Sequence, residues 1–292
     1  MLGKGARARR KNPHIETENR HIDEIDICDK GQARGQGMKV IVIAAGRGRR
    51  LMPTTADVPK CFAEISGKRL IDWAVEAFKA NGIDQICFIG GYQIDRVKQD
   101  YPHFTFRHNP DWEHNNILAS LFYASDLMDG PFICCYSDVL FTPDIAGRLA
   151  KAPGDMVLGV DTAWLERYAE RTEHPPDDAE KVTIQNGHIT RVDRTIPPEH
   201  AYGEYIGVAK FSAAGAAKLR DYYERRREAF AGQPWRDAKV FEKAYKILLF
   251  QDMIEQGERF NYVDTPGGYI EVDTQQDFDY ARQHWTSKHL GR

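Results

Sequence analysis

One glycine-rich segment decides how this chain folds, and it reads Val40-Ile41-Val42-Ile43-Ala44-Ala45-Gly46-Arg47-Gly48-Arg49-Arg50-Leu51-Met52-Pro53-Thr54-Thr55. The run of β-branched residues at its start is typical of a strand that is covered on both faces. Gly46 and Gly48 allow the backbone to approach a ligand closely and to turn its N–H groups toward that ligand. The segment therefore predicts a buried strand over residues 38–43 that runs into a ligand-binding loop.

The loop is strongly cationic. Arg47, Arg49 and Arg50 lie within it, and Val58-Pro59-Lys60 adds a fourth cation shortly afterwards. Such a concentration of positive charge beside two glycines suits a polyphosphate ligand. The alternative is a tight turn between a strand and a helix with solvated arginines, which accounts less well for so many cations at one place.

Two common phosphate-binding loops do not fit the segment. A dinucleotide-binding fingerprint that starts at Gly46 needs a third glycine where the chain has Leu51. A Walker A loop that ends at Gly67-Lys68 needs a glycine where the chain has Phe62, and Ser or Thr where it has Arg69.

The segment resembles the signature of the sugar-phosphate nucleotidyltransferase family, which reads A-A-G-x-G-x-R-L, then P-x-T, then P-K. Arg50-Leu51 takes the place of the family's Arg-Leu pair, and the likeness extends from residue 38 to about residue 281. The resemblance implies that the loop from Ala45 through Gly46 and Arg47 to Gly48 binds a nucleotide. It also implies that Arg50 and Lys60 are the catalytic cations that neutralise the triphosphate.

Size and charge are those of an ordinary globular protein. The chain has 292 residues, of which 42% are apolar and 28% charged, with a net charge of −3. This composition gives no reason to expect nucleic acid as a partner, and no apolar run reaches the roughly 20 residues that a membrane helix needs. The five cysteines lack paired metal-binding spacing, so we expect reduced thiols and a cytoplasmic location.

Residues 1–37 differ from the rest of the chain. They are rich in charged residues and glycine, and they show hardly any periodic apolar pattern. Such a composition predicts a disordered extension. The resemblance implies that residues 38–292 form one nucleotidyltransferase domain. We assign no function to the extension.

From residue 38 onward, strand and helix patterns alternate. This alternation predicts an α/β fold with a Rossmann-like, mixed but mostly parallel sheet and helices on both faces. Residues of about 155–265 are expected to form an elaboration on the acceptor side, including a hairpin over residues 181–192 that turns at Asn186-Gly187. The expected strands are 38–43, 84–89, 104–108 (an edge strand), 131–136, 156–160, 205–211, 260–263 and 269–272. The expected helices are 70–78, 94–99, 116–128, 213–230, 241–255 and 275–285.

Two aspartates are candidate metal ligands. Asp138 follows the apolar strand over residues 131–136, and ligands of such sheets bind beyond the carboxyl ends of the strands. The family resemblance implies that Asp138 and a later Asp in a Glu-x-Asp motif, here Asp273, hold Mg²⁺, for which two protein carboxylates suffice. The alternatives are a turn residue at Asp138 and a helix N-cap at Asp273.

Other site residues rest on weaker patterns. The resemblance implies that Lys181 of the Glu180-Lys181 pair grips the phosphate of the acceptor, although an exposed hairpin lysine is the alternative. Asn116 and Ser120, spaced four apart on one helical face, are candidate contacts of the nucleotide. An N-cap asparagine and a packing serine explain the same pair equally well.

The branch of the family is indicated by Asn115-Asn116-Ile117-Leu118-Ala119-Ser120-Leu121, by Tyr168-x-x-Arg171-x-x-His174-Pro175 and by Gly203-Glu204-Tyr205-Ile206-Gly207. These stretches resemble cytidylyltransferases with small head groups, which act on aminoethyl- or hydroxyethylphosphonate or on phosphocholine. The resemblance implies a Mg²⁺-dependent enzyme that couples CTP to such an acceptor. A sugar-1-phosphate enzyme that uses UTP or dTTP, and a regulatory protein that binds nucleotide without turnover, remain the alternatives. The oligomeric state is not readable from the sequence.

Overall fold

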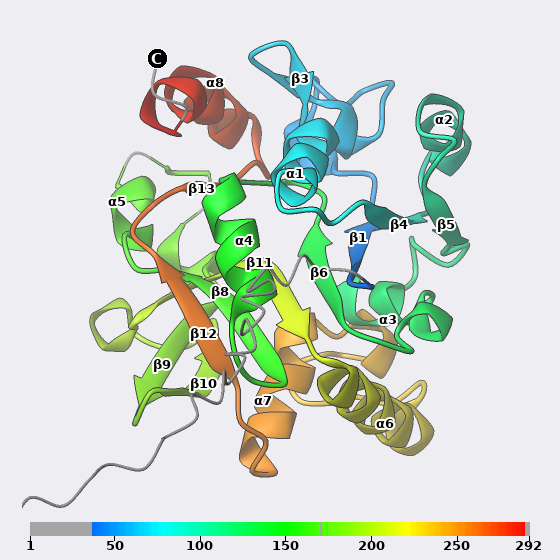
Figure 1. The fold of residues 1–292 in the computed structure, drawn as a ribbon, viewed down its shortest axis with the longest axis vertical. Coiled ribbons are helices and arrows are strands. Elements are labelled where there is room, and N and C mark those ends of the chain that lie inside the picture. Colours follow the sequence, from blue (N-terminus) through cyan, green and yellow to red (C-terminus); the bar gives the residue numbers. More distant parts are fainter. Residues whose placement is uncertain (1–36, 170, 174, 290–292) are drawn as a thin grey trace, which may run out of the picture. The chain divides into compact units, whose positions relative to one another are not determined.

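The computed structural model describes residues 37–169, 171–173 and 175–289, all within one compact unit that spans residues 33–292. The prediction for residues 1–37 therefore lies, apart from Gly37, outside the described residues. Figure 1 shows the arrangement of helices and strands in the described part.

A nine-stranded sheet forms the centre of the fold. Strand β1 (Lys39–Ala44) lies in its middle, because its apolar side chains are covered on both faces. On one side it pairs in parallel with β6 (Phe132–Tyr136), and on the other with β4 (Gln85–Gly90). Strand β5 (Thr105–His108) continues the parallel arrangement to the edge, as the sequence predicts.

The other half of the sheet is mixed. Strand β11 (Gly203–Phe211) runs antiparallel to β6 and pairs in turn with β8 (Met156–Asp161) and β9 (Lys181–Gln185). Strand β12 (Asn261–Thr265) lies parallel to β8, and β10 (His188–Asp193) completes a hairpin with β9. Within this sheet only β10 and β11 run against the other strands, so the prediction of a mixed, mostly parallel sheet is confirmed.

The strand side chains alternate between two hydrophobic layers. Val40 and Val42 pack with α1 (Leu70–Lys79) and α4 (Pro143–Lys151) on one face. Ile41 and Ile43 contribute to the layer on the other face. That second layer includes α3 (Ile117–Phe122), α6 (Ala213–Phe230) and α7 (Lys246–Glu255) (Figure 1). Helices therefore cover both faces, as expected for a doubly wound fold.

Smaller elements complete the chain around this sheet. Strands β7 (Val139–Phe141) and β13 (Tyr269–Glu271) form an antiparallel pair beside the ends of the central strands. The remaining elements are β2 (Glu64–Ile65), β3 (Lys68–Arg69), α2 (Ile94–Asp100), α5 (Trp164–Tyr168) and α8 (Gln275–His289). Among the described residues, none of the helices combines the length and apolar character needed to cross a membrane.

The expected helix over residues 116–128 is shorter than predicted. Helix α3 ends at Phe122, and a separate 3₁₀ turn covers Ser125–Leu127. The expected helix over residues 241–255 is likewise divided into a 3₁₀ turn over Phe241–Lys243 and α7. Here the backbone carbonyls of Glu242 and Ala244 accept hydrogen bonds from the N–H groups of Asn116 and Leu118, so tertiary contacts hold the chain out of a continuous helix.

The hairpin between β9 and β10 is confirmed. Asn186 and Gly187 both adopt positive φ angles, of 52° and 77°, at the two central turn positions. A two-residue hairpin turn of this type favours Asn-Gly for that reason.

Candidate active site

The loop after β1 is held by backbone contacts and by tight packing. The N–H of Tyr92 donates to the carbonyl of Ala45 over 2.9 Å, which ties the loop to the end of β4. A Cβ atom placed on Gly91 would lie 2.7 Å from that same carbonyl, so only glycine permits this approach. The hydroxyl of Thr55 donates to the carbonyl of Gly48 over 3.2 Å. The loop is therefore fixed on both sides.

Gly48 and Lys60 lie in direct contact. Gly48 has a φ of +69°, a conformation that residues with a Cβ rarely adopt. A Cβ atom there would lie 2.7 Å from Cδ of Lys60, which is closer than real contacts allow. The glycine thus leaves the space in which the Lys60 side chain runs.

Lys60 bridges the two aspartates predicted as metal ligands. Its Nζ donates to Oδ2 of Asp138 over 2.5 Å and to Oδ1 of Asp273 over 2.7 Å. Arg50 forms an ion pair with the other oxygen of Asp273. The Lys60 side chain is buried, and burial alone lowers the pKa of an ammonium group. The two carboxylates outweigh this effect and raise the pKa of Lys60 above its ordinary value, so Lys60 carries a full positive charge.

Pairing of two short strands brings the aspartates together. Asp138 lies between β6 and β7, and Asp273 follows β13. Because β7 and β13 pair, the N–H of Val272 donates to the carbonyl of Asp138 over 2.8 Å. Residues 135 positions apart in the chain therefore meet at one end of the sheet.

Asp277 fixes the backbone that carries Asp273. Its Oδ2 accepts hydrogen bonds from the N–H groups of Asp273 and Thr274, over 3.1 and 2.8 Å. Its Oδ1 accepts from Nε of Arg171 over 2.6 Å, in a pair that is buried on both sides. The hydroxyl oxygen of Thr274 in turn accepts from the N–H of Asp277 over 3.2 Å, so Thr274 caps α8 in a capping box with Asp277, and Asp273 is left to point at Lys60.

The two aspartates fit a divalent cation. Oδ1 of Asp138 is buried and has no hydrogen-bond partner among the described residues, and an acceptor left in this way suits a cation ligand. The space between Asp138 and Asp273 holds a positive charge in this structure, that of Lys60. No cluster of three or more metal-binding side chains occurs in the part of the chain that the structure describes. Mg²⁺ does not require one, since it completes its shell with water and substrate phosphates.

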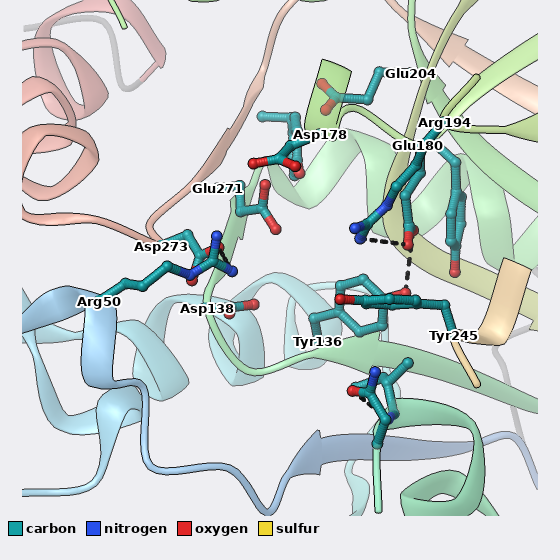
Figure 2. A pocket seen from close by; sticks show the side chains of 14 residues that line it. Arg50, Tyr136, Asp138, Asp178, Glu180, Arg194, Glu204, Tyr245, Glu271 and Asp273 are labelled. Atoms are coloured by element: carbon teal, nitrogen blue, oxygen red, sulfur yellow. Dashed lines mark hydrogen bonds and ion pairs between the residues drawn. The ribbon is translucent and has the colours of Figure 1, made fainter. Parts of the chain in front are cut away.

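A cavity opens from this pair of aspartates, and Figure 2 shows it from close by. Arg50, Asp138, Asp273 and Glu271 lie at one end, which we call the metal end, and Arg194, Glu180, Tyr136 and Tyr245 lie at the other, which we call the acceptor end. The lining comprises Arg50, Asn116, Ile117, Tyr136, Asp138, Asp178, Glu180, Arg194, Glu204, Tyr205, Tyr245, Tyr269, Glu271 and Asp273. Six of these side chains are carboxylates and two are arginines.

The acceptor end contains a short chain of polar contacts. The hydroxyl of Tyr136 donates to Glu180 over 3.1 Å, and Arg194 reaches the other oxygen of Glu180 over 3.4 Å. Arg194 also lies over the ring of Tyr245, 4.0 Å from its centroid. Burial raises the pKa of the Glu180 carboxyl, and the positive charges of Arg194 and Lys246 offset part of that effect.

Glu271 is the third carboxylate of the metal end. It belongs to the Glu-x-Asp motif with Asp273 and is drawn beside it in Figure 2. Burial raises the pKa of Glu271 well above its usual range, and the negative charges of Asp273 and Asp138 add to the shift. The three neighbouring carboxyl groups of Asp138, Glu271 and Asp273 favour the binding of a cation.

The structure places the predicted site residues in two groups. Arg50, Asp138, Asp273 and Asn116 all line the cavity, and Lys60 joins the two aspartates. Asn116 is also the N-cap of α3, because its side chain accepts a hydrogen bond from the N–H of Ile117.

The other predicted residues lie away from the cavity lining. Ser120 is buried, and its hydroxyl accepts a hydrogen bond from Asn109 over 2.9 Å. Arg47 lies against the ring of Tyr92. Lys181 is buried, and its Nζ donates to the backbone carbonyls of Pro176 and Ala179, over 3.0 and 3.4 Å. Burial lowers the pKa of Lys181.

Several lining residues were not singled out from the sequence. Glu180 and Glu271 belong to the two motifs that supplied Lys181 and Asp273, so the signal was present but pointed to the neighbouring residue. Arg194 and Tyr245 carry no motif, since they reach the cavity from a loop after β10 and from the residue before α7. Only the fold identifies them.

Comparisons with known proteins point to one family of enzymes. The sequence profile of the MobA-like NTP transferase domain matches residues 40–189 of the chain. A CTP:phosphoglutamine cytidylyltransferase from Campylobacter jejuni is 31% identical over 255 residues, which cover 83% of this chain and 98% of that protein. A 2-aminoethylphosphonate cytidylyltransferase from Lancefieldella rimae is 26% identical, and the match covers 64% of this chain and 95% of that protein.

A solved structure shares the fold. The inositol-1-phosphate CTP transferase from T. maritima superimposes with a TM-score of 0.64 at 20% identity. The superposition covers 87% of this chain and 98% of that one.

Proposed function

Because the chain belongs to the family of MobA-like NTP transferase domains, we propose that it transfers a cytidylyl group from CTP to a small phosphorylated or phosphonate acceptor. The resemblance to nucleotidyltransferases that the glycine-rich loop indicated is thereby confirmed, and the chain is an enzyme of this family. The proposal rests above all on one observation: beside the loop, Lys60 forms ion pairs with both Asp138 and Asp273.

In the proposed reaction, an anionic oxygen on the phosphorus of the acceptor attacks the α-phosphorus of CTP. A new P–O bond forms, the bond to the β-phosphate oxygen breaks, and pyrophosphate leaves with the electron pair. No general base is needed, because the attacking oxygen is already anionic near neutral pH. Catalysis of this kind depends on positioning and on electrostatic stabilisation.

The residues of the metal end supply that stabilisation. Backbone N–H groups of Ala45 to Gly48 are proposed to cradle the triphosphate, with Arg47, Asn116 and Ser120 as further nucleotide contacts. Lys60 and Arg50, which now pair with carboxylates, are proposed to turn to the phosphate oxygens when the nucleotide binds.

Asp138 and Asp273 are the residues that would hold Mg²⁺, and the chemistry that it supplies when bound is charge neutralisation at the α-phosphate and the leaving group. The unpartnered Oδ1 of Asp138 supports this role.

Arg194 is the cation that lines the acceptor end, and we propose that it faces the anionic group of the acceptor. Lys181 stays a prediction for that role, although its ammonium group donates to backbone carbonyls in this structure. A cytoplasmic location also stays a proposal, since CTP is made there. The four described cysteines are all unpaired, which suits a reducing compartment.

The test is pyrophosphate release with Mg²⁺, measured for each of the four NTPs with 2-aminoethylphosphonate, 2-hydroxyethylphosphonate, phosphocholine, glutamine phosphate and glucose 1-phosphate. We expect release that requires CTP and one of the small acceptors. Release only with UTP or dTTP and glucose 1-phosphate would replace the proposed substrates. Tight CTP binding without release for any pair would instead indicate a regulatory nucleotide-binding protein.

A further inference from the structure

The turn that carries Arg50 is packed against helix α8. Leu51, the residue after Arg50, is fully buried in a hydrophobic cluster. The members of this cluster that belong to α8 are Phe278, Ala281 and Trp285. The turn is closed on its other side by the N–H of Thr55, which donates to the carbonyl of Leu51 over 3.2 Å. The arginine turn therefore has a fixed apolar anchor on α8.

A single hydrogen bond between two neutral side chains ties the same turn to the start of α8. Oγ1 of Thr54 donates to Oε1 of Gln275 over 2.7 Å, across 221 positions of the chain. Both side chains are half-buried. Gln275 is the first residue of α8 and lies two positions after Asp273. One short stretch of backbone thus carries a candidate metal ligand and the contact to the arginine turn.

Arg50 joins these two segments a second time, through charge. It forms an ion pair with Asp273, although its side chain is 61% exposed and lines the cavity. In the proposed reaction Arg50 leaves Asp273 for the phosphate oxygens of the nucleotide, so this ion pair opens. The hydrogen bond from Thr54 to Gln275 involves no charge and no phosphate ligand. It can therefore persist and hold the turn while Arg50 is engaged with the nucleotide.

We infer that Thr54 and Gln275 are positioning residues, which hold the turn so that Arg50 meets the triphosphate at the productive point. The inference rests on the proposed function through the role of Arg50. It concerns two residues that the motifs leave open, since Thr54 is the variable position of P-x-T and Gln275 lies after the Glu-x-Asp motif. Such residues matter because phosphoryl transfer depends on positioning, and small displacements of a catalytic group are costly.

Variants of Thr54 test the inference. Thr54→Val keeps the shape of the side chain and removes the hydroxyl. We expect kcat/KM for CTP to fall about fivefold, and the affinity for Mg²⁺–CTP in calorimetry to weaken by a similar factor, while KM for the acceptor stays unchanged. The melting temperature of the free protein should stay close to that of the parent, because Leu51 remains buried and Arg50 still pairs with Asp273. Thr54→Ser keeps the hydroxyl and should recover most of the loss.

Combined variants show through which residue the contact acts. Gln275→Met removes the acceptor of the hydrogen bond, so the double variant with Thr54→Val should lose no more than either single variant. In an Arg50→Met background, Thr54→Val should cost no further nucleotide affinity, whereas a merely structural role would lower the melting temperature and add to the loss. Thr183→Val is the matched control. The Thr183 hydroxyl pairs with that of Thr190 over 2.9 Å in the hairpin, outside the cavity.

The outcomes separate the inference from the proposed function. Parental kcat/KM and affinity in Thr54→Val, or a loss that adds to that of Arg50→Met, overturns the inference and leaves the cytidylyltransferase standing. If a nucleotide binds but no acceptor gives pyrophosphate release, the proposed function fails. The affinities for that nucleotide then decide, because a loss in Thr54→Val that Thr54→Ser recovers supports the inference, and equal affinities overturn it. A protein that binds none of the four NTPs contradicts both.

Discussion

Gly48 lies against Lys60 so closely that a Cβ atom at position 48 would come within 2.7 Å of the lysine side chain. The glycine of the glycine-rich loop and the lysine between the two aspartates are therefore parts of one packed unit. The loop glycine serves here in two ways, since it also adopts a positive φ of 69°.

Gly48→Ala is predicted to damage both stability and activity. The left-handed backbone costs a non-glycine residue about 1 kcal/mol, and the new methyl group displaces Lys60 from Asp138 and Asp273. We expect kcat/KM to fall more than about tenfold, measured by pyrophosphate release. Gly130→Ala is the control, because Gly130 has no positive φ and open space around its Cα. Equal activity of both variants would show that the close contact between Gly48 and Lys60 does not affect catalysis.

Lys60→Met is predicted to abolish most of the activity and to strengthen binding of Mg²⁺ to the free protein. Loss of a cation that stabilises transferring phosphate costs about 10²- to 10³-fold in kcat. Without the lysine, Asp138 and Asp273 repel each other, so added Mg²⁺ should raise the melting temperature more than it does in the parent. Lys243→Met, at a lysine that pairs with backbone carbonyls outside the cavity, should leave the Mg²⁺ response as in the parent. An unchanged Mg²⁺ response in Lys60→Met would argue against a metal site at these aspartates.

Asp273→Asn is predicted to abolish Mg²⁺-dependent turnover while the fold is retained. The amide cannot supply the anionic oxygen that a divalent cation prefers, and it weakens the ion pairs with Arg50 and Lys60. Circular dichroism checks the fold, and pyrophosphate release over a range of Mg²⁺ concentrations checks the activity. Parental activity in this variant would refute the assignment of two carboxylates to the metal.

Asp277→Asn is predicted to act through the position of Asp273. The change removes the carboxylate from a buried ion pair with Arg171, which lowers the free energy of unfolding by about 3 kcal/mol. It also loosens the turn that carries Asp273, so the Mg²⁺ concentration for half-maximal activity should rise. Asp279→Asn, two residues later on the exposed side of the same helix, should change the free energy of unfolding by less than about 0.5 kcal/mol. If the two variants need the same Mg²⁺ concentration, Asp277 has no role in positioning.

The charge of Glu180 is predicted to make stability depend on pH. Burial raises the pKa of its carboxyl above the ordinary value of 4.5. Between 4.5 and the higher native pKa, the unfolded chain has lost this proton while the folded chain still holds it, so rising pH favours unfolding. Glu180→Gln removes this effect, and the gain in melting temperature over the parent should be larger at pH 7.5 than at pH 4. A gain that does not change with pH would contradict the assignment.

Much of the fold was predictable because it depends on local patterns. The apolar run around Val42 specified a central strand, and Asn186-Gly187 specified the hairpin turn. The divided helix over residues 241–255 was not predictable, because the carbonyls of Glu242 and Ala244 accept hydrogen bonds from a segment far away in the chain. Local periodicity contains no information about such partners.

The sequence by itself identified residues that meet at the metal end, since Gly48, Lys60, Asp138 and Asp273 each belong to a recognisable motif. The tertiary structure alone decided the acceptor end. There Arg194, Tyr205 and Tyr245 come from separate elements and line one cavity with Glu180. The local motif indicated the neighbouring Lys181 instead of Glu180. The physical reason is that a phosphate loop is built by consecutive residues, whereas the shape and charge of a cavity depend on which side chains the packing of distant strands and helices brings together.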